Sequence, residues 1–217
     1  MLDTCQRHQI MLNIKKCTFL VPFGNLLGHV FRKQGLRVDP TKITVILNLQ
    51  ASQSVEQLRA TLGHTGYYQR FLKIYAQIMA PLLKNDATYC WNEECNKSLE
   101  TLNEKMDSAP ILVFPKWDVK FHVHGDASCI MLGVVLTQPR VKGLNHPIAF
   151  ASHRLSKVEK NYSTNEREGL AMVYALQKFL HYLLGGHFKM YTDHSALKCL
   201  VNKPMLGVRI CRWLLLF

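Results

Sequence analysis

The chain has 217 residues, and 48% of them are hydrophobic, which is enough apolar surface for one or two folded domains. This composition excludes a wholly disordered chain, because apolar burial can offset the loss of chain entropy on folding. No apolar run approaches the roughly 20 residues of a membrane helix, and the N-terminus does not begin a secretory signal. We therefore expect an intracellular protein, in the cytoplasm or nucleus, without a transmembrane segment.

The net charge is +12 and is unevenly distributed. Residues 1–110 carry 13 basic and 9 acidic side chains, whereas residues 111–217 carry 14 and 6. A basic surface favours a polyanionic partner, most often nucleic acid, but a solvated surface without a specific partner fits the charge equally well. The seven cysteines form no Cys-x-x-Cys pair, which favours reduced intracellular thiols over disulfides or a zinc site.

Residues 12–38 have the pattern of strands separated by turns. The run 19–24 is interrupted at Pro22 and Gly24, and a second run follows at 26–31, so we expect a hairpin.

A small helical unit is predicted over residues 39–110. Asp39-Pro40 is a helix-start signal, with aspartate as the cap and proline in the first turn. Ser54-x-x-Gln57 is a variant of the capping box, and a further helix is expected from Trp91 to Met106.

The pattern changes at Ile111, after which the order β-β-β-α-β-α is predicted. Ser163-x-x-Glu166 is a capping box that opens a helix to about Leu184, and Gly143 and Pro147 mark a turn between strands. This order predicts an α/β domain with a mixed sheet. The expected strands are 119–125, 130–136, 147–152 and 188–192, and two more helices are expected over 195–201 and 208–217.

Three carboxylates stand at the ends of these elements: Asp126 and Asp193 each end a strand, and Glu168 lies near the start of the long helix. Two strand ends and a helix start can converge, and converging carboxylates hold hard divalent cations such as Mg²⁺. Two Mg²⁺ ions would activate water and stabilise the leaving oxygen in phosphodiester hydrolysis. Taken singly, none of these acids is specific, because a strand-end aspartate is usually a turn former. His194 is more typical of a surface or capping residue than of a base.

The helix that contains Glu168 has an apolar stripe, and Glu168 lies one turn before it. A carboxylate on a buried face is costly unless it is paired or binds a cation. The alternative is a first-turn glutamate that faces solvent and is favoured by the helix dipole, and spacing alone favours this alternative. The stripe consists of Met172, Leu176, Phe179, Leu180 and Leu183.

The combined motifs resemble the Pol polyprotein of gypsy-type long-terminal-repeat retrotransposons and their retroviral relatives, over nearly the full chain. The N-terminal motifs are similar to the end of the reverse transcriptase palm, a primer-grip-like hairpin and the thumb, and the later motifs are similar to a ribonuclease H domain. The matching runs are Leu27-Gly28-His29, Val38-Asp39-Pro40, Gly66-Tyr67-Tyr68, Arg70-Phe71, Asp126-Ala127-Ser128, Leu132-Gly133, Asn161-Tyr162-Ser163-Thr164, Thr192-Asp193-His194 and Arg212-Trp213.

The resemblance implies a division into 1–38, the end of the palm with its hairpin; 39–110, the thumb and connector; and 111–217, a ribonuclease H-like domain that lacks its C-terminal end. It implies a nuclease that cuts the RNA strand of RNA–DNA hybrids. Asp126, Glu168 and Asp193 would be the catalytic metal ligands, with Mg²⁺, or Mn²⁺ in its place, as the cofactor. No Asp-Asp pair occurs, so the polymerase motif is absent. The expected partners are an RNA–DNA hybrid or other nucleic acid and the rest of a Pol polyprotein.

Three departures from the family pattern keep other interpretations open. Met131 stands where the family usually has glycine, Gly169 replaces a usual leucine in the helix, and the family's fourth aspartate would lie beyond Phe217. The alternatives are a catalytically dead remnant that still binds nucleic acid and a truncated copy without function. Tyr67, Tyr68 and Arg70 would lie either on a duplex-facing helix or, as is more usual for such an aromatic pair, in the thumb core.

Overall fold

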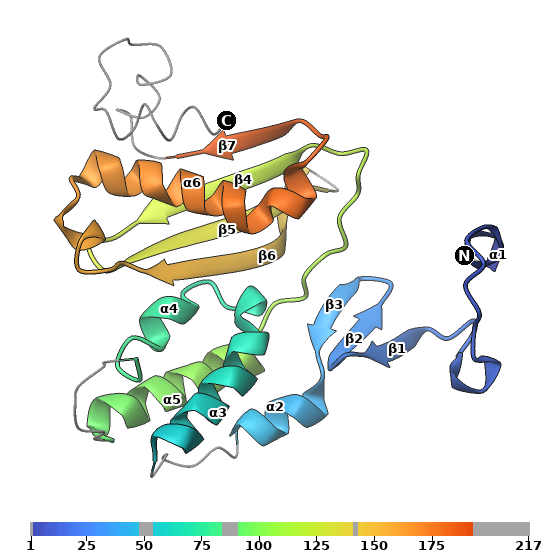
Figure 1. The fold of residues 1–217 in the computed structure, drawn as a ribbon, viewed down its shortest axis with the longest axis horizontal. Helices are drawn as coiled ribbons and strands as arrows, with labels where there is room; N and C mark the ends of the chain where they lie inside the picture. Colours follow the sequence, from blue (N-terminus) through green and yellow to red (C-terminus); the bar gives the residue numbers. More distant parts are fainter. Residues whose placement is uncertain (1, 48–53, 84–90, 141–142, 193–217) are drawn as a thin grey trace.

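The computed structural model describes residues 2–47, 54–83, 91–140 and 143–192 (Figure 1). Asp193, His194 and the helices predicted over 195–201 and 208–217 lie outside these residues. Among the described residues, no helix combines the length and apolarity that crossing a bilayer requires.

The N-terminal part consists of a short helix α1 (Leu2–Arg7), a 3-10 turn η1 (Ile14–Lys16) and a small antiparallel sheet in the order β1-β2-β3. A hairpin is present as predicted, but its turn is Leu27-Gly28, with positive φ angles of 51° and 72°, inside the run 26–31 that the sequence predicts as a strand. Gly24 does not break a strand, because it lies within β1 and pairs with Phe31. The strands are β1 (Phe23–Leu26), β2 (His29–Arg32) and β3 (Gly35–Val38).

The helical unit follows, and side-chain caps mark the starts of three of its helices, α2 (Pro40–Leu47), α3 (Val55–Tyr67) and α5 (Glu93–Asp107). Ser54 accepts the Gln57 N–H, Asn92 accepts the Cys95 N–H at 3.0 Å, and Asp39 accepts the Thr41 N–H at 3.0 Å. Each cap satisfies a backbone donor that the helix leaves unpaired. Between α3 and α5 lie η2 (Gln69–Phe71) and α4 (Tyr75–Ile78).

The second half forms a four-stranded mixed sheet, which we call the sheet unit together with its helix. The strand order is β6-β5-β4-β7, with β4 parallel to β7 and antiparallel to β5. Helix α6 covers one face of the sheet (Figure 1). The predicted β-β-β-α-β order is thus confirmed. The elements are β4 (Phe121–Ala127), β5 (Met131–Pro139), β6 (Asn145–Arg154), η4 (Glu159–Asn161), α6 (Thr164–Leu183) and β7 (Phe188–Tyr191).

Pro147 lies inside β6 rather than in a turn, which corrects the sequence prediction. It pairs with Thr137 next to a register shift in the β5–β6 ladder. Proline is tolerated there because β6 is an edge strand, where the missing N–H costs no ladder hydrogen bond. Its carbonyl oxygen still accepts the Val113 N–H at 2.9 Å.

The buried face of α6 matches the predicted stripe only in part, since Phe179 and Leu183 are buried as expected. The Ser163–Glu166 capping box is present, but Leu180 is 52% exposed. Small side chains instead bring the helix close to the sheet: Ala171 and Ala175 are fully buried, and a Cβ added at Gly125 would lie 3.7 Å from the Ala171 Cβ. A stripe drawn from large apolar residues alone misses a face built on alanine.

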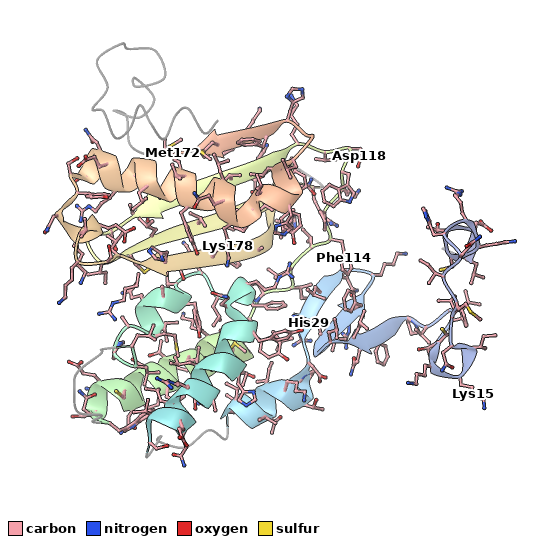
Figure 2. All side chains as sticks on the ribbon, in the orientation of Figure 1. Lys15, His29, Phe114, Asp118, Met172 and Lys178 are labelled. Carbon is pink, nitrogen blue, oxygen red and sulfur yellow. The ribbon has the colours of Figure 1, made fainter. Side chains whose placement is uncertain are left out.

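The described residues form three clusters of buried hydrophobic side chains, and the smallest contains Leu132, Leu155 and Ala171. Another cluster joins the small sheet to the helical unit and includes Val38, Phe71, Leu102 and Leu112. The third lies between the sheet and α6 and includes Val123, Leu136 and Phe179. By contrast, Lys15 lies on the N-terminal segment, which extends away from both units (Figure 2); on this segment Met11 and Leu20 are almost fully exposed.

Candidate functional site

Glu168 contacts strand β4 at one corner of the sheet unit, one residue after Asp126. Asp126 is exposed near the end of β4. Glu168 lies in the second turn of α6, and its Oε1 accepts the backbone N–H of Ala127 at 3.2 Å. The hydrogen bond places the helix carboxylate beside the strand residue that follows Asp126. The structure therefore places Glu168 against the end of β4, whereas Asp126 lines a cleft on the β4–β5 surface.

Glu168 is 5% exposed, so the interpretation of this side chain as a solvent-facing glutamate is wrong. It lies on the same helix face as Ala171 and Ala175, which pack on the sheet. Burial of a carboxylate is costly unless hydrogen bonds or a cation compensate for the lost hydration. The Ala127 N–H supplies one such hydrogen bond.

Asp193 lies outside the described residues, so its position relative to the other two acids stays a prediction. The ladder between β4 and β7 is described up to the pair His124–Tyr191. In sequence, Asp126 follows His124 by two residues, and Asp193 follows Tyr191 by two residues. The described part of the chain contains no group of three or more His, Cys, Asp or Glu side chains arranged to hold a metal ion.

A cleft of about 480 Å³ opens beside Asp126, on the β4–β5 surface. His124 and Thr137 line it from the strands, Ser128 from the turn between β4 and β5, and Lys73 and Gln77 from the helical unit. Sequence reasoning missed this cleft. Strand alternation would place His124 on the same face as Asp126, but no local pattern connects Lys73 with a strand more than 40 residues later.

The His124 ring stacks on Tyr191 of β7, with centroids 4.6 Å apart and planes inclined by 9°. Burial, and secondarily the nearby His122, lowers the pKa of His124. The lowered pKa favours the neutral imidazole of His124 on this face of the sheet.

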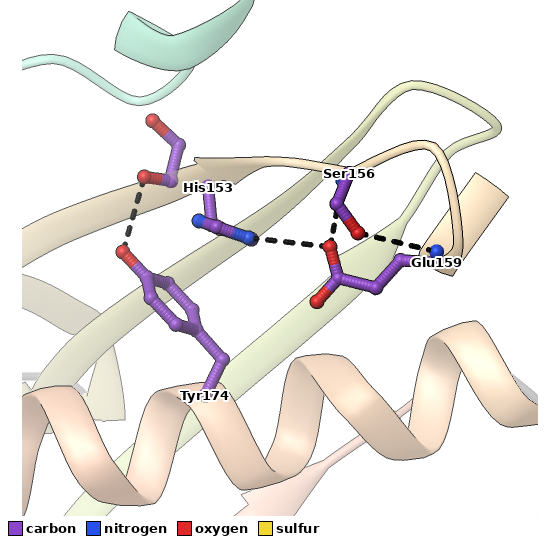
Figure 3. A network of polar contacts seen from close by, with 5 residues as sticks. His153, Ser156, Glu159 and Tyr174 are labelled. Atoms are coloured by element: carbon purple, nitrogen blue, oxygen red, sulfur yellow. Dashed lines mark hydrogen bonds and ion pairs between the residues drawn. The ribbon is translucent and has the colours of Figure 1, made fainter.

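A network of polar contacts lies in the loop that connects the end of β6 to the start of α6 (Figure 3). Ser156 and Glu159 cap each other: the Ser156 N–H donates to Glu159 Oε2 at 2.7 Å, and the Glu159 N–H donates to Ser156 Oγ at 3.3 Å. The His153 Nε2 lies 3.5 Å from the same carboxylate. This network orders the loop that leads into the helix carrying Glu168.

The two tyrosines of α3 have different environments. Tyr68 is buried and donates to the Gly28 carbonyl at 3.0 Å, as expected for a core residue. Tyr67 is 51% exposed and donates to the Leu27 carbonyl. Arg70 donates to the Tyr182 hydroxyl on α6 rather than lying on an open helix surface.

Comparison with known proteins supports the interpretation of the sequence. Residues 91–190 match the family model of the RNase H-like domain found in reverse transcriptase. The retrovirus-related Pol polyprotein from transposon 297 of Drosophila melanogaster is 36% identical over 208 residues, which is 94% of this chain and 19% of the relative. The chain belongs to the retroelement Pol family. It spans about a fifth of the length of the curated Pol relatives it matches.

Solved structures of retroviral enzymes have the same fold as this Pol-family chain. The foamy viral protease-reverse transcriptase in complex with dsDNA matches with a TM-score of 0.81 at 22% identity, covering 94% of this chain and 44% of that chain. The same viral enzyme in complex with an RNA/DNA hybrid matches with a TM-score of 0.77 at 23% identity, covering 92% and 28%.

Proposed function

We propose that this chain supplies a ribonuclease H-type nuclease site that hydrolyses the RNA strand of RNA–DNA hybrids. The observation that carries the proposal is the Ala127 N–H to Glu168 Oε1 hydrogen bond, which brings a buried helix carboxylate beside the strand end at Asp126. Its support is the position of this corner within the RNase H-like domain of a retroelement Pol chain. The foamy viral relative bound to an RNA/DNA hybrid suggests the substrate class.

Mg²⁺, with Mn²⁺ as a substitute, is the proposed cofactor, held by Asp126, Glu168 and Asp193. Carboxylate oxygens are the hard donors that Mg²⁺ prefers, and a buried carboxylate such as Glu168 gains from a cation beside it. The donors at this corner therefore fit the ion. When bound, the ions would lower the pKa of attacking water and neutralise charge on the leaving oxygen.

The described residues have separate tasks in this proposal. The Ala127 N–H orients the Glu168 carboxylate, and packing of α6 on the sheet excludes water around it. Asp126 is exposed and therefore accessible to a phosphate backbone. Lys73, which lines the same cleft as Asp126, would attract that backbone. The division into a palm-end hairpin, a thumb and connector, and a nuclease domain is part of the same proposal, as is assembly with the rest of a Pol polyprotein.

The test is cleavage of an end-labelled RNA–DNA hybrid by purified 1–217 in Mg²⁺ or Mn²⁺. We expect Asp126→Asn and Glu168→Gln each to reduce the rate by roughly a hundredfold or more, because each removes a ligand charge. The amide in Glu168→Gln can still accept the Ala127 N–H, so the urea midpoint should change little. Asp118→Asn is the matched control, since Asp118 is an exposed acid ahead of β4 (Figure 2).

Cleavage that persists in Asp126→Asn would come from a contaminating nuclease and would contradict the assignment. Equal losses in Asp118→Asn and Asp126→Asn would also contradict it, because a general effect of charge would then explain both.

A second candidate function is binding of nucleic acid without cleavage. One observation favours it: the chain carries a net charge of +12, which suits a polyanionic partner without requiring a metal site. Hybrid binding in the absence of any metal-dependent cleavage by the unmodified chain would select this function over the first.

A further inference from the structure

Strand β6 forms the junction between the sheet unit and the helical unit, because it packs against η2 and α4 (Figure 1). Phe150 of this strand packs on the core of the helical unit. Ser152 and Arg154 follow on the same strand and add polar contacts. The edge strand of the sheet is therefore covered by the helical unit along part of its length.

Ser152 connects three elements through two hydrogen bonds. Its Oγ accepts the buried Ala76 N–H of α4 at 2.8 Å, and its carbonyl oxygen accepts the Tyr174 hydroxyl of α6 at 3.0 Å. Ser152 is buried, with 9% of its surface exposed. A buried N–H that loses its acceptor is costly, so separation of the two units would leave the Ala76 donor unpaired until water reached it.

Two arginines make further contacts across the junction, one from each side. Arg154 Nη1 donates to the Leu83 carbonyl at 3.2 Å and to the Ala80 carbonyl at 3.5 Å, both in the segment after α4. Arg70 of the helical unit donates from Nη2 to the Tyr182 hydroxyl of α6 at 3.1 Å. Hydrogen bonds from charged groups are stronger than those between neutral groups.

Apolar packing at the junction is limited by two hollows. The cleft of about 480 Å³ beside Asp126 and a second cavity of about 420 Å³ lie on either side of Lys73 and Ile74, which line both. Because two cavities interrupt the apolar packing at the junction, directional polar contacts contribute to the relative orientation of the two units.

We infer that Ser152, Arg154 and the Arg70–Tyr182 pair are positioning residues that hold the two units as one body. They fix where a hybrid bound along the helical unit meets Asp126 and Glu168. The expected effect of these residues on cleavage rests on the proposed nuclease function. Their expected effect on the structure does not.

The test uses the full chain with Arg154→Ala and Tyr182→Phe, singly and together. Tyr182→Phe keeps the ring that packs on Trp117 and Phe121 and removes only the hydroxyl. Lys157→Ala is the control, because it removes a positive charge from the exposed loop after β6. The readouts are calorimetric unfolding, hydrogen exchange at the Ala76 amide, and kcat/KM on two hybrids, one long enough to reach both units and one that reaches only the sheet unit.

We expect the unmodified chain and Lys157→Ala to unfold in one transition and the double variant in two, with exchange at Ala76 faster by roughly tenfold or more. The preference for the long hybrid should fall by roughly tenfold or more, while the rate on the short hybrid is kept, because the two contacts no longer act together. One transition with unchanged exchange in the double variant would overturn the inference. If the unmodified chain cleaves neither hybrid, the nuclease proposal fails, and unfolding and exchange alone decide the inference.

Discussion

At the scale of single residues, Glu159 shows how neighbours control a carboxylate. Partial burial by itself would raise the pKa of Glu159, but the Ser156 backbone N–H, the Ser156 hydroxyl and His153 together lower it below the ordinary value of 4.5. A lowered pKa in the folded state means that the ionised carboxylate stabilises the fold. This stabilisation is fully present above the pKa that Glu159 has in the unfolded chain. It is lost as the pH falls through the lower pKa that Glu159 has in the folded chain.

We therefore expect Glu159→Gln to flatten the acid limb of the stability profile. Above pH 4.5 the unmodified chain should be the more stable of the two, and below this pH the difference should shrink as Glu159 becomes protonated. Urea unfolding at a series of pH values measures it. The variant His153→Gln removes the imidazole and keeps the Ser156 hydrogen bonds, so it distinguishes the two contributions to the lowered pKa of Glu159. Two profiles that run parallel through the acid range would show that the network does not contribute.

Glu168 marks the limit of sequence reasoning about single residues. Its place in the first turns of a capped helix was predictable, because the Ser163–Glu166 box fixes where α6 begins. Its burial was not, because the direction of a helix side chain depends on which face packs on the sheet. That face is set by Ala171, Ala175 and Gly125, whose small size permits close approach but gives a weak apolar signal.

At the scale of elements, Gly35 joins the small sheet to the connector that leads into the sheet unit. Its φ is 149°, and an added Cβ would lie 2.2 Å from the Leu112 carbonyl oxygen. That oxygen accepts the Leu36 N–H at 2.7 Å, and the Leu112 N–H donates to the Leu36 carbonyl at 3.0 Å. Only glycine allows the strand to come so close to residue 112.

Gly35→Ala should destabilise the fold by about 1–3 kcal/mol, because it adds backbone strain and a clash with a backbone atom. Gly24→Ala is the matched control: Gly24 lies in the same sheet, and an added Cβ would have no atom within 4 Å. The comparison is made by urea unfolding of the two variants. An equal effect at both positions would contradict the close approach at Leu112.

Element types followed from local signals, whereas pairings did not. Each of these signals involves only a few neighbouring residues, as in the helix caps at Asp39 and Ser163 and the alternating pattern of β4 and β5. The β5–β6 register shift that admits Pro147 into a strand depends on a partner strand, and no pattern within β6 reveals it. Exposure of Leu180 likewise depends on what packs against α6.

At the scale of the whole molecule, charge is the most direct link to a partner. The net charge of +12 comes from 27 basic and 15 acidic side chains. Neutralising phosphates releases counterions, so affinity for nucleic acid should fall steeply with salt and depend little on base sequence.

With roughly four phosphate contacts, affinity for a hybrid should fall about a hundredfold between about 50 and 200 mM salt. Fluorescence anisotropy of a labelled hybrid at several salt concentrations measures this slope. A hybrid of scrambled sequence is the control and should bind equally well. A shallow slope would exclude a phosphate-dominated interface and with it both candidate functions.

The cleft beside Asp126 belongs to this scale too, which is why the sequence could not predict it. It forms only where Lys73 and Gln77 of one unit meet the strands of the other. The family resemblance implied three divisions, 1–38, 39–110 and 111–217, but it did not reveal the contacts between the helical unit and the sheet unit, which depend on side chains such as Ser152 and Arg154.

The parallel pairing of β4 with β7 has a consequence for synthesis of the chain on the ribosome. Residues 121–127 are made first and pair at once with β5 in a local hairpin, but their other edge has no partner until residues 188–191 have emerged. During that interval β4 presents open N–H and C=O groups, which can pair with another chain. Contacts between distant residues form slowly. Aggregation of nascent chains should therefore be most acute while α6 is being translated and should decline once β7 closes the edge.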